Sequence, residues 1–278
     1  MSYTLGEDIL TVQNVSLEIE GKLILRDINL KIKDIVRPNC NTGQIIGFLG
    51  PSGRGKTQLF KILAGLTKSS VSSNRKVTGS VLLGPNKTPV KPGDVGVVAQ
   101  NYPLFEHRSI WSNLELVLKK EIPASQRKEK ILYYLDKFKM IEHKDKYPAV
   151  LSGGQRQRIA IIQQLLCSEY FILLDEPFSG LDPIMTSQVC EMITEVANMH
   201  DKNTIIIVSH DIPSTISISN MLWLLGYDYD ENKQAIPGAR IKFEENLMDR
   251  GICWKENLIN TPEFFSFVKD VRNTFNHL

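Results

Sequence analysis

The sequence predicts an α/β fold in which a parallel sheet is covered by helices, and three observations indicate it. Four short apolar runs have the character of strands buried on both faces, and they lie at residues 44–50, 95–99, 170–174 and 204–209. Helical patterns separate these runs along the chain, as α/β proteins require. A glycine-rich loop follows the first run directly, between a strand and a helix.

Composition places the chain among ordinary globular proteins. It has 278 residues, 42% of them hydrophobic, which fits one large domain or one domain with an appendage. The net charge of +2 argues against a nucleic-acid surface. The four cysteines show no CxxC pair, so we expect buried free thiols. Neither a signal peptide nor a membrane span is recognisable, so a cytoplasmic location is expected.

The remaining elements follow in chain order. Short alternating runs over residues 9–32 predict antiparallel strands at the edge of the sheet, and residues 56–66 predict an amphipathic helix. Between residues 100 and 150 the sequence becomes charged and helix-prone, which indicates a helical insertion. Apolar stripes then predict a helix after residue 155, a helix around residues 189–196 and a final helix. That last helix starts at Pro262 and has a stripe at Phe264, Val268, Val271 and Phe275.

Residues 50–57, GPSGRGKT, fit the pattern G-x-x-x-x-G-K-[ST] of a phosphate-binding loop. Backbone N–H groups of such a loop converge on phosphate oxygens, at the positive end of the following helix dipole. Lys56 would bind the β- and γ-phosphates, and Thr57 would offer its hydroxyl to Mg²⁺. A glycine-rich turn without a ligand is the alternative. The nucleotide-binding residues predicted in this loop are Gly50, Pro51, Ser52, Gly53, Arg54, Gly55, Lys56 and Thr57.

Two carboxylates and a histidine follow two of the apolar runs, where ligands bind in parallel sheets. Asp175 ends one run and is assigned to Mg²⁺, directly or through water, and Glu176 to the general base for the attacking water. His210 ends another run and would contact the γ-phosphate while holding Glu176 and the water in register. An acidic turn and a capping histidine are the alternatives. Surface positions are expected for His107, His143, His200 and His277.

Five motifs occur in one chain: GPSGRGKT, VVAQNYPLFEH around Gln100, LSGGQ at residues 151–155, ILLDEPFSGLDP around Asp175, and VSHD ending in Asp211. In this order and spacing they resemble the ATP-binding cassette (ABC) family, over about residues 9–226. The resemblance implies a P-loop NTPase core with an N-terminal antiparallel β-subdomain and an inserted helical subdomain at about residues 101–168. It also implies ATP and Mg²⁺ as cofactors and ATP hydrolysis as the activity.

The resemblance further implies a site shared by two copies. In the family, ATP lies between the phosphate loop of one nucleotide-binding domain and the LSGGQ segment of another. Gln100 would sense Mg²⁺ or the attacking water, and it counts as a catalytic and a metal-binding candidate. Asp182 would lie at the dimer interface and couple the two sites. The residues that would contact the nucleotide across the interface are Ser152, Gly153, Gly154 and Gln155.

Family resemblance also implies partners. The chain would act as a peripheral ATPase on the cytoplasmic face of the inner or plasma membrane, joined to transmembrane permease subunits. An importer of the bacterial type would add a substrate-binding protein. A groove near Gln100 would receive a permease helix, and Tyr102, Leu104, Phe105 and Trp111 would contact it or pack in the core. The alternative is a soluble ABC ATPase that acts on nucleic acid or ribosomes, although no nucleic-acid partner is expected from the charge.

The sequence departs from the family in three places. No aromatic residue occurs between Tyr3 and Phe48, where the family places a side chain that stacks on adenine, so Ile19 or a neighbour would supply an apolar face. Residues 34–42 have the character of an insertion. Residues 227–278 form a C-terminal extension beyond the nucleotide-binding domain of residues 1–226, and they end in the amphipathic helix.

Overall fold

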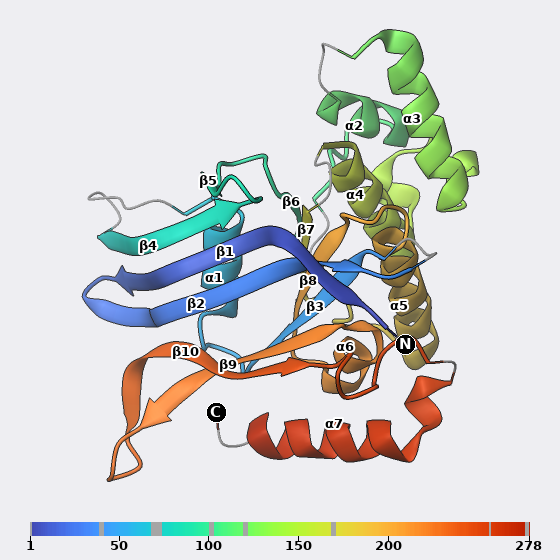
Figure 1. Ribbon diagram of the computed structural model, residues 1–278. Coiled ribbons are helices and arrows are strands. Elements are labelled where there is room, and N and C mark those ends of the chain that lie inside the picture. Colours follow the sequence, from blue (N-terminus) through green and yellow to red (C-terminus); the bar gives the residue numbers. More distant parts are fainter. Residues whose placement is uncertain are drawn as a thin grey trace.

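A computed structural model describes residues 2–38, 42–67, 74–99, 103–118, 122–167, 171–255, 257–275 and 278 (Figure 1). The strands are β1 Thr4–Ile19, β2 Lys22–Val36, β3 Gln44–Leu49, β4 Arg75–Leu83, β5 Thr88–Pro89, β6 Gly96–Val98, β7 Phe171–Asp175, β8 Thr204–Ser209, β9 Met221–Tyr229 and β10 Ala235–Asn246. The helices are α1 Lys56–Leu63, α2 Ile110–Val117, α3 Ala124–Lys137, α4 Gly153–Cys167, α5 Pro183–Ala197, α6 Ile212–Ile218 and α7 Pro262–Phe275.

The strands join in one sheet in the order β5-β4-β1-β2-β10-β9-β3-β8-β7-β6. The segment from β9 to β6 is parallel, which confirms the predicted α/β class. Its strands are apolar because side chains on both faces are buried. Ile46 of β3 packs with α1 and the antiparallel strands, whereas Ile45 packs with α5 and the helical insertion.

The antiparallel strands predicted over residues 9–32 are longer than expected. β1 and β2 form a continuous hairpin, and β4 pairs with the other edge of β1. Several register shifts interrupt the β1–β2 pairing, and such bulges add twist. The result is a curved antiparallel layer that packs over α1 and leads into the parallel strands (Figure 1).

The C-terminal residues take part in the sheet. β9 runs through Gly226 to Tyr229, so the expected limit of the nucleotide-binding domain lies inside a strand. β10 pairs antiparallel with β9 and meets β2 at Ala239 and Leu25, which places it between the antiparallel and parallel strands. Arg26, Arg240 and Lys242 surround Asp228 as ion pairs across these strands. Their side chains are partly exposed, so packing of the strands carries most of the stabilisation.

The helices largely follow their predicted stripes. α1 ends at Leu63 rather than at residue 66 because Gly65, with φ of +69°, adopts the left-handed conformation that terminates helices. α7 begins at Pro262 as predicted and buries Phe264, Val268 and Val271. It packs against α6, beside the parallel strands. In the described part of the chain, no helix is long and apolar enough to cross a membrane.

The described cysteines Cys167, Cys190 and Cys253 are free thiols, the first two half-buried and the third buried. Burial raises the pKa of both Cys190 and Cys253 to about 12, so these thiols stay protonated at neutral pH. Cys40 lies outside the described residues. The expectation of buried free thiols is therefore met by Cys253, whereas Cys167 and Cys190 are free but only half-buried.

Candidate active site

Three neighbouring strands bring the predicted catalytic residues to one edge of the sheet. Leu49, the last residue of β3, pairs with Ser209 of β8, and Asp175, the last residue of β7, pairs with Val208. The phosphate loop, His210 and Glu176 follow directly after these three positions. Because β3, β8 and β7 are parallel, their carboxyl ends meet at the same edge, the usual ligand edge of such sheets.

The phosphate loop holds its lysine in place without a ligand. Gly53 and Gly55 have φ of +79° and +90°, conformations that residues with a side chain rarely adopt. Gly55 caps α1, so Lys56 is the first helical residue. The Lys56 ammonium is buried and donates hydrogen bonds to the Gly50 carbonyl at 2.5 Å and the Pro51 carbonyl at 3.1 Å. The two carbonyls accept hydrogen bonds from the Lys56 ammonium that phosphate oxygens of a bound nucleotide would accept instead.

Charges across the site act on each other. Burial lowers the pKa of Lys56, and the carboxylates of Glu176 and Asp175 oppose that shift. Burial raises the pKa of Asp175, Glu176 raises it further, and Lys56 and Lys61 act in the opposite direction. A negative charge on Asp175 is therefore costly in the ligand-free chain, and a nearby cation would offset the cost.

The donor set fits a Mg²⁺ ion that binds together with a nucleotide. Asp175 offers a half-buried carboxylate, and Thr57 follows Lys56 in the first turn of α1 with an exposed side chain. Among the described residues, no group of three or more His, Cys, Asp and Glu side chains could hold a metal ion. Mg²⁺ needs few protein ligands, since it keeps waters and binds phosphates. Two protein oxygens plus a triphosphate are therefore a sufficient set.

Glu176 is fixed by its backbone and by its neighbours. Its φ of +51° is uncommon for a residue other than glycine, and its N–H donates to the Val208 carbonyl at 2.8 Å. The carboxylate oxygen Oε2 lies 2.8 Å from His210 Nδ1, and it accepts weaker hydrogen bonds from the His210 N–H at 3.3 Å and the Ser209 hydroxyl at 3.4 Å. The Glu176 side chain is 16% exposed, compared with 58% for His210. The histidine thus caps the carboxylate from the solvent side.

The LSGGQ segment forms the start of α4. The Ser152 hydroxyl accepts a hydrogen bond from the Gln155 N–H at 3.3 Å, and the Gln155 side chain accepts one from the Ser152 N–H at 3.0 Å. This reciprocal arrangement is a capping box. A Cβ at Gly153 would meet nothing within 4 Å, and at Gly154 it would meet only the flexible end of Met185. The fold of this chain therefore does not require glycine at residue 153.

Gln155 also contacts a residue that was expected to be a simple surface histidine. Its side-chain nitrogen lies 3.2 Å from His143 Nε2, and His143 is half-buried. Arg156, the next residue, pairs with Glu106 and donates to the Pro148 carbonyl at 3.1 Å. No spacing pattern links His143 to α4 in the sequence, because His143 approaches the helix from a separate turn.

The segment after Gln100 is organised by a residue that the sequence analysis did not select. Gln100 and Tyr102 lie outside the described residues. The buried Asn113 accepts a hydrogen bond from the Phe105 N–H at 2.8 Å and donates to the Phe105, Arg108 and Ser109 carbonyls at 3.0–3.2 Å. The only hint was an amide in the buried stripe of α2, between Ile110 and Leu114.

The aromatic and apolar residues of this segment divide into two groups. Leu104 is buried, and Trp111 packs partly buried against the core, so these two side chains serve packing. Phe105 is 47% exposed. Phe105 is therefore the described member of this set that remains available to a partner.

Asp182 has a clear role within the chain. Its carboxylate accepts hydrogen bonds from the Ile184 N–H at 2.9 Å and the Met185 N–H at 3.0 Å, and Pro183 follows as the first residue of α5. This is the usual chemistry of a helix N-cap. Ile184, the second residue of the helix, is 72% exposed beside it.

An aromatic residue does reach the phosphate loop, from a part of the chain where none was expected. The Arg54 guanidinium lies 4.3 Å from the centre of the Tyr227 ring, a cation–π contact between the loop and β9. Ile19 is partly buried at the paired end of β1. The apolar run of β9, MLWLLGYDY, was the sequence signal that could have pointed to Tyr227.

The site and fold define a class: an α/β protein whose phosphate loop and strand-end carboxylates form a P-loop nucleotide site. The sequence model of the ABC transporter family matches residues 34–179, which is more than half of the chain. The chain therefore belongs to the ABC transporter family, and it is an ATP-binding cassette ATPase. The suspected resemblance is confirmed.

Curated relatives support the same family. The chain is 34% identical over 253 residues to "Spermidine/putrescine import ATP-binding protein PotA" of Thermotoga maritima, covering 86% of this chain and 64% of that protein. It is 33% identical to "Glutamate/aspartate import ATP-binding protein GltL" of Escherichia coli, covering 76% and 85%. It is 29% identical to "Lipopolysaccharide export system ATP-binding protein LptB" of Haemophilus influenzae, covering 78% and 87%. The chain thus spans less than two thirds of the first of these relatives.

Solved structures confirm the fold. The structure of cbiO1 from Clostridium perfringens, described as part of the ABC transporter complex cbiONQ, matches with a TM-score of 0.70 at 24% identity, covering 88% of this chain and 91% of that one. The ATP-binding cassette MJ0796, a dimer with ADP and Pi in a post-hydrolysis state, matches with a TM-score of 0.64 at 22% identity, covering 86% and 99%. Both support the P-loop NTPase architecture.

Proposed function

We propose that this chain hydrolyses ATP to drive transport through separate permease subunits, as the nucleotide-binding subunit of an importer. The observation that carries the proposal is the shared edge where Lys56, Asp175, Glu176 and His210 follow three adjacent strands. Relatives named as import proteins favour the direction, although one relative is named for export. The cargoes in the names of these relatives differ, so the proposal concerns ATP hydrolysis and the direction of transport.

The residues of the site divide the chemistry among them. Lys56 exchanges its two loop carbonyls for the β- and γ-phosphate oxygens of ATP. Thr57 and Asp175 would hold Mg²⁺, which would supply positive charge to neutralise the phosphates. Glu176 accepts the proton of the attacking water, and His210 keeps the Glu176 carboxylate in position through the 2.8 Å contact. Gln100 is proposed to sense the same water or metal.

A second copy of the chain would complete the site. Ser152, Gly153, Gly154 and Gln155 would approach the γ-phosphate held by the partner's phosphate loop, with the N-terminus of α4 directed at the negative charge. The open space beside Gly153 supports this proposal, because a glycine unused by its own fold suits the close approach of a ligand. Asp182 and the exposed Ile184 would lie near the interface.

A mixing experiment tests the shared site. Lys56→Met and Ser152→Arg should each abolish hydrolysis as pure proteins. Mixed in equal amounts, half of the randomly paired dimers contain one of each variant. Each mixed dimer then has one site with both substitutions and one intact site, so about a quarter of the sites should recover. Measured phosphate release that stays at zero on mixing, with dimers present by light scattering, would contradict a site shared between copies.

The permease partner is proposed from the exposed Phe105 and the loop that Asn113 organises. Through this contact the chain would sit on the cytoplasmic face of the inner or plasma membrane, with a substrate-binding protein on the far side. The test is capture of integral membrane proteins from native membranes by the tagged chain. Phe105→Ser should lose the capture, whereas Phe265→Ser, a change at a 62% exposed phenylalanine on α7, should keep it. Equal capture of membrane proteins by the two variants would show that the partner does not bind through Phe105.

A further inference from the structure

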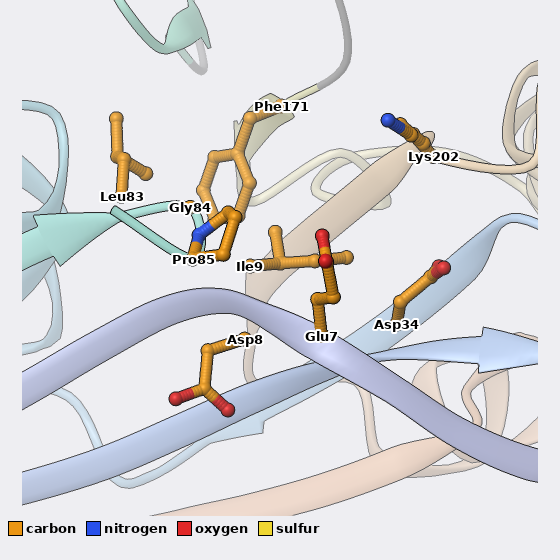
Figure 2. Close-up of a pocket in the computed structure, with 9 residues that line it drawn as sticks. All are labelled: Glu7, Asp8, Ile9, Asp34, Leu83, Gly84, Pro85, Phe171 and Lys202. Atoms are coloured by element: carbon orange, nitrogen blue, oxygen red, sulfur yellow. The ribbon is translucent and has the colours of Figure 1, made fainter. Parts of the chain in front are cut away.

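A second pocket lies at the opposite edge of the sheet from the nucleotide site. Its volume is about 250 Å³, and it is formed where β1, β2 and the end of β4 meet the beginnings of β7 and β8 (Figure 2). Ile9, Pro85 and Phe171 gather at one side of it. Glu7, Asp34 and Lys202 lie at the other side, with Asp8 pointing away from Glu7.

The irregular pairing of β1 builds this pocket. Glu7, Asp8 and Ile9 are consecutive residues that line the pocket, and Asp8 points away from Glu7, as successive side chains of a strand do (Figure 2). Register shifts between Leu5 and Asp8, and again between Asp8 and Leu10, interrupt the pairing of β1 with β2 beside the pocket. Bulges of this kind redirect side chains and are over-represented beside functional sites. Asp8 is already neutralised by Lys31 at 3.0 Å, so Glu7 and Asp34 are the carboxylates left to act on a ligand.

The charge on this side of the pocket is incompletely balanced. Asp34 Oδ1 is buried and has no hydrogen-bond partner among the described residues. Burial raises the pKa of Asp34, and the nearby carboxylates of Asp201 and Glu7 act in the same direction. A backbone hydrogen bond from Ile35 and the positive charge of Lys202 lower the pKa of Asp34, but the net shift remains upward. A buried carboxylate oxygen without a partner is costly, and a cation that reached Asp34 would remove part of that cost.

We infer that this pocket binds a small organic monoammonium ion with an apolar body. The body would lie on Ile9, Pro85 and Phe171, and the ammonium group would lie between Glu7 and Asp34. The pocket is slightly smaller than the roughly 300 Å³ at which sites for drug-sized ligands begin, so the ligand must be small. A bare metal ion suits it poorly, since no group of three metal-binding side chains occurs in the described chain.

The pocket is separate from the nucleotide site. Phe171 is the first residue of β7 and Asp175 the last, so one strand of five residues connects the two sites. At about 3.3 Å per residue, their backbones are roughly 13 Å apart. Strand β8 separates the two sites likewise, because Lys202 precedes its first residue and His210 follows its last. Ligand binding in the pocket therefore needs no residue of the catalytic edge.

Three probes of similar shape test the charge requirement: 2-phenylethylamine, 2-phenylethanol and 3-phenylpropionate. Binding is measured on the full chain by calorimetry at low ionic strength, without nucleotide. The ammonium should bind at least about tenfold more tightly than the alcohol, as expected for a hydrogen bond to a charged group, and the carboxylate should bind most weakly. Absence of saturable binding by the ammonium at millimolar concentrations, or equal binding of ammonium and alcohol, would overturn the proposal.

Two variants with opposite expected effects locate the binding. Asp34→Asn should erase the preference for the ammonium, whereas Lys202→Met should strengthen ammonium binding, because an exposed competing cation has been removed. Asp136→Asn, at an exposed position on α3, is the matched control and should leave binding unchanged. Circular dichroism confirms that each variant is folded. Ammonium binding that is equal in Asp34→Asn and the unchanged chain would place the ligand elsewhere and refute this pocket as its site.

Discussion

The phosphate edge and the LSGGQ segment are both polar, yet they are held in different ways. At the phosphate edge, side chains distant in sequence contact each other, as Glu176 does with His210 across two buried strands. At the start of α4, Ser152 and Gln155 contact each other within one turn of helix. The phosphate edge is therefore held by tertiary contacts that form within one chain. At the start of α4 the contacts form a local cap, and a Cβ added at the exposed Gly153 would meet nothing within 4 Å.

Substitutions in the two regions should therefore have different effects. A change at the phosphate edge alters groups that depend on each other, so it should affect both chemistry and stability. A change at Gly153 meets open space, so it should affect only what approaches from outside.

Glu176→Gln should reduce turnover by roughly 10²- to 10⁴-fold, the range for loss of a general base. ATP binding should persist, because the Lys56 contacts are unchanged, and an ATP-bound dimer should accumulate. Phosphate release and light scattering measure the two effects. Turnover at the normal rate would remove Glu176 as the base and leave the phosphate edge without its assigned chemistry.

Gly153→Leu should lower hydrolysis by about tenfold or more, because the added side chain enters the space that a second copy would occupy. The free energy of unfolding of the variant should change by no more than about 0.5 kcal/mol, as is usual for surface positions. Steady-state turnover and urea unfolding give the two values. Glu263→Leu, in the exposed first turn of α7, is the control that should keep full activity. A folded Gly153 variant with full turnover would end the contrast between the two regions.

Asp175→Asn should stabilise the ligand-free chain by on the order of 1 kcal/mol at neutral pH while weakening Mg²⁺-dependent ATP binding. The folded-state pKa of Asp175 is raised, so its charged form costs stability. That cost is absent below the unfolded pKa of about 3.9 and is complete above the folded pKa. The gain should therefore disappear in acid, as thermal melts from pH 3 to 8 would show. A variant less stable at pH 7 than the unchanged chain would contradict this sign.

GTP should compete with ATP to within about tenfold, which corresponds to less than 1.4 kcal/mol. The reason is that no aromatic residue lies between Tyr3 and Phe48 to stack on adenine. Competition for a fluorescent ATP analogue measures the ratio. A strong preference for adenine would show that another group, with the Arg54–Tyr227 contact the first to examine, selects the base.

Much of this could be read from the sequence because the signals are local. Apolar runs that end in Asp175 and Ser209 identify buried strands and the edge where ligands bind, and the glycine pattern of residues 50–57 identifies the loop. The parallel sheet and the position of Glu176 and His210 follow from these signals. The resemblance to the ABC family is confirmed by the comparisons, whereas the roles of the individual site residues remain predictions.

Other features depend on contacts that no short pattern contains. The Asn113 amide hydrogen-bonds to the loop at Phe105, which precedes its own helix. His143 contacts Gln155 because a separate turn of the chain brings the two side chains together. β10 has an irregular alternation, so its interior position could not be read from periodicity. Tyr227 reaches Arg54 only because β9 lies beside β3 in the sheet.

The position of β10 has a consequence for synthesis and folding. It lies in the middle of the sheet, between β2 and β9, yet it comes last in chain order among the described strands. Until residues 235–246 emerge, β2 and β9 each lack the strand that pairs with them at this position of the sheet. Contacts between such distant residues form slowly, and open strand edges aggregate. A nascent chain on a ribosome stalled before residue 235 should therefore be sensitive to protease at the unpaired edges of β2 and β9.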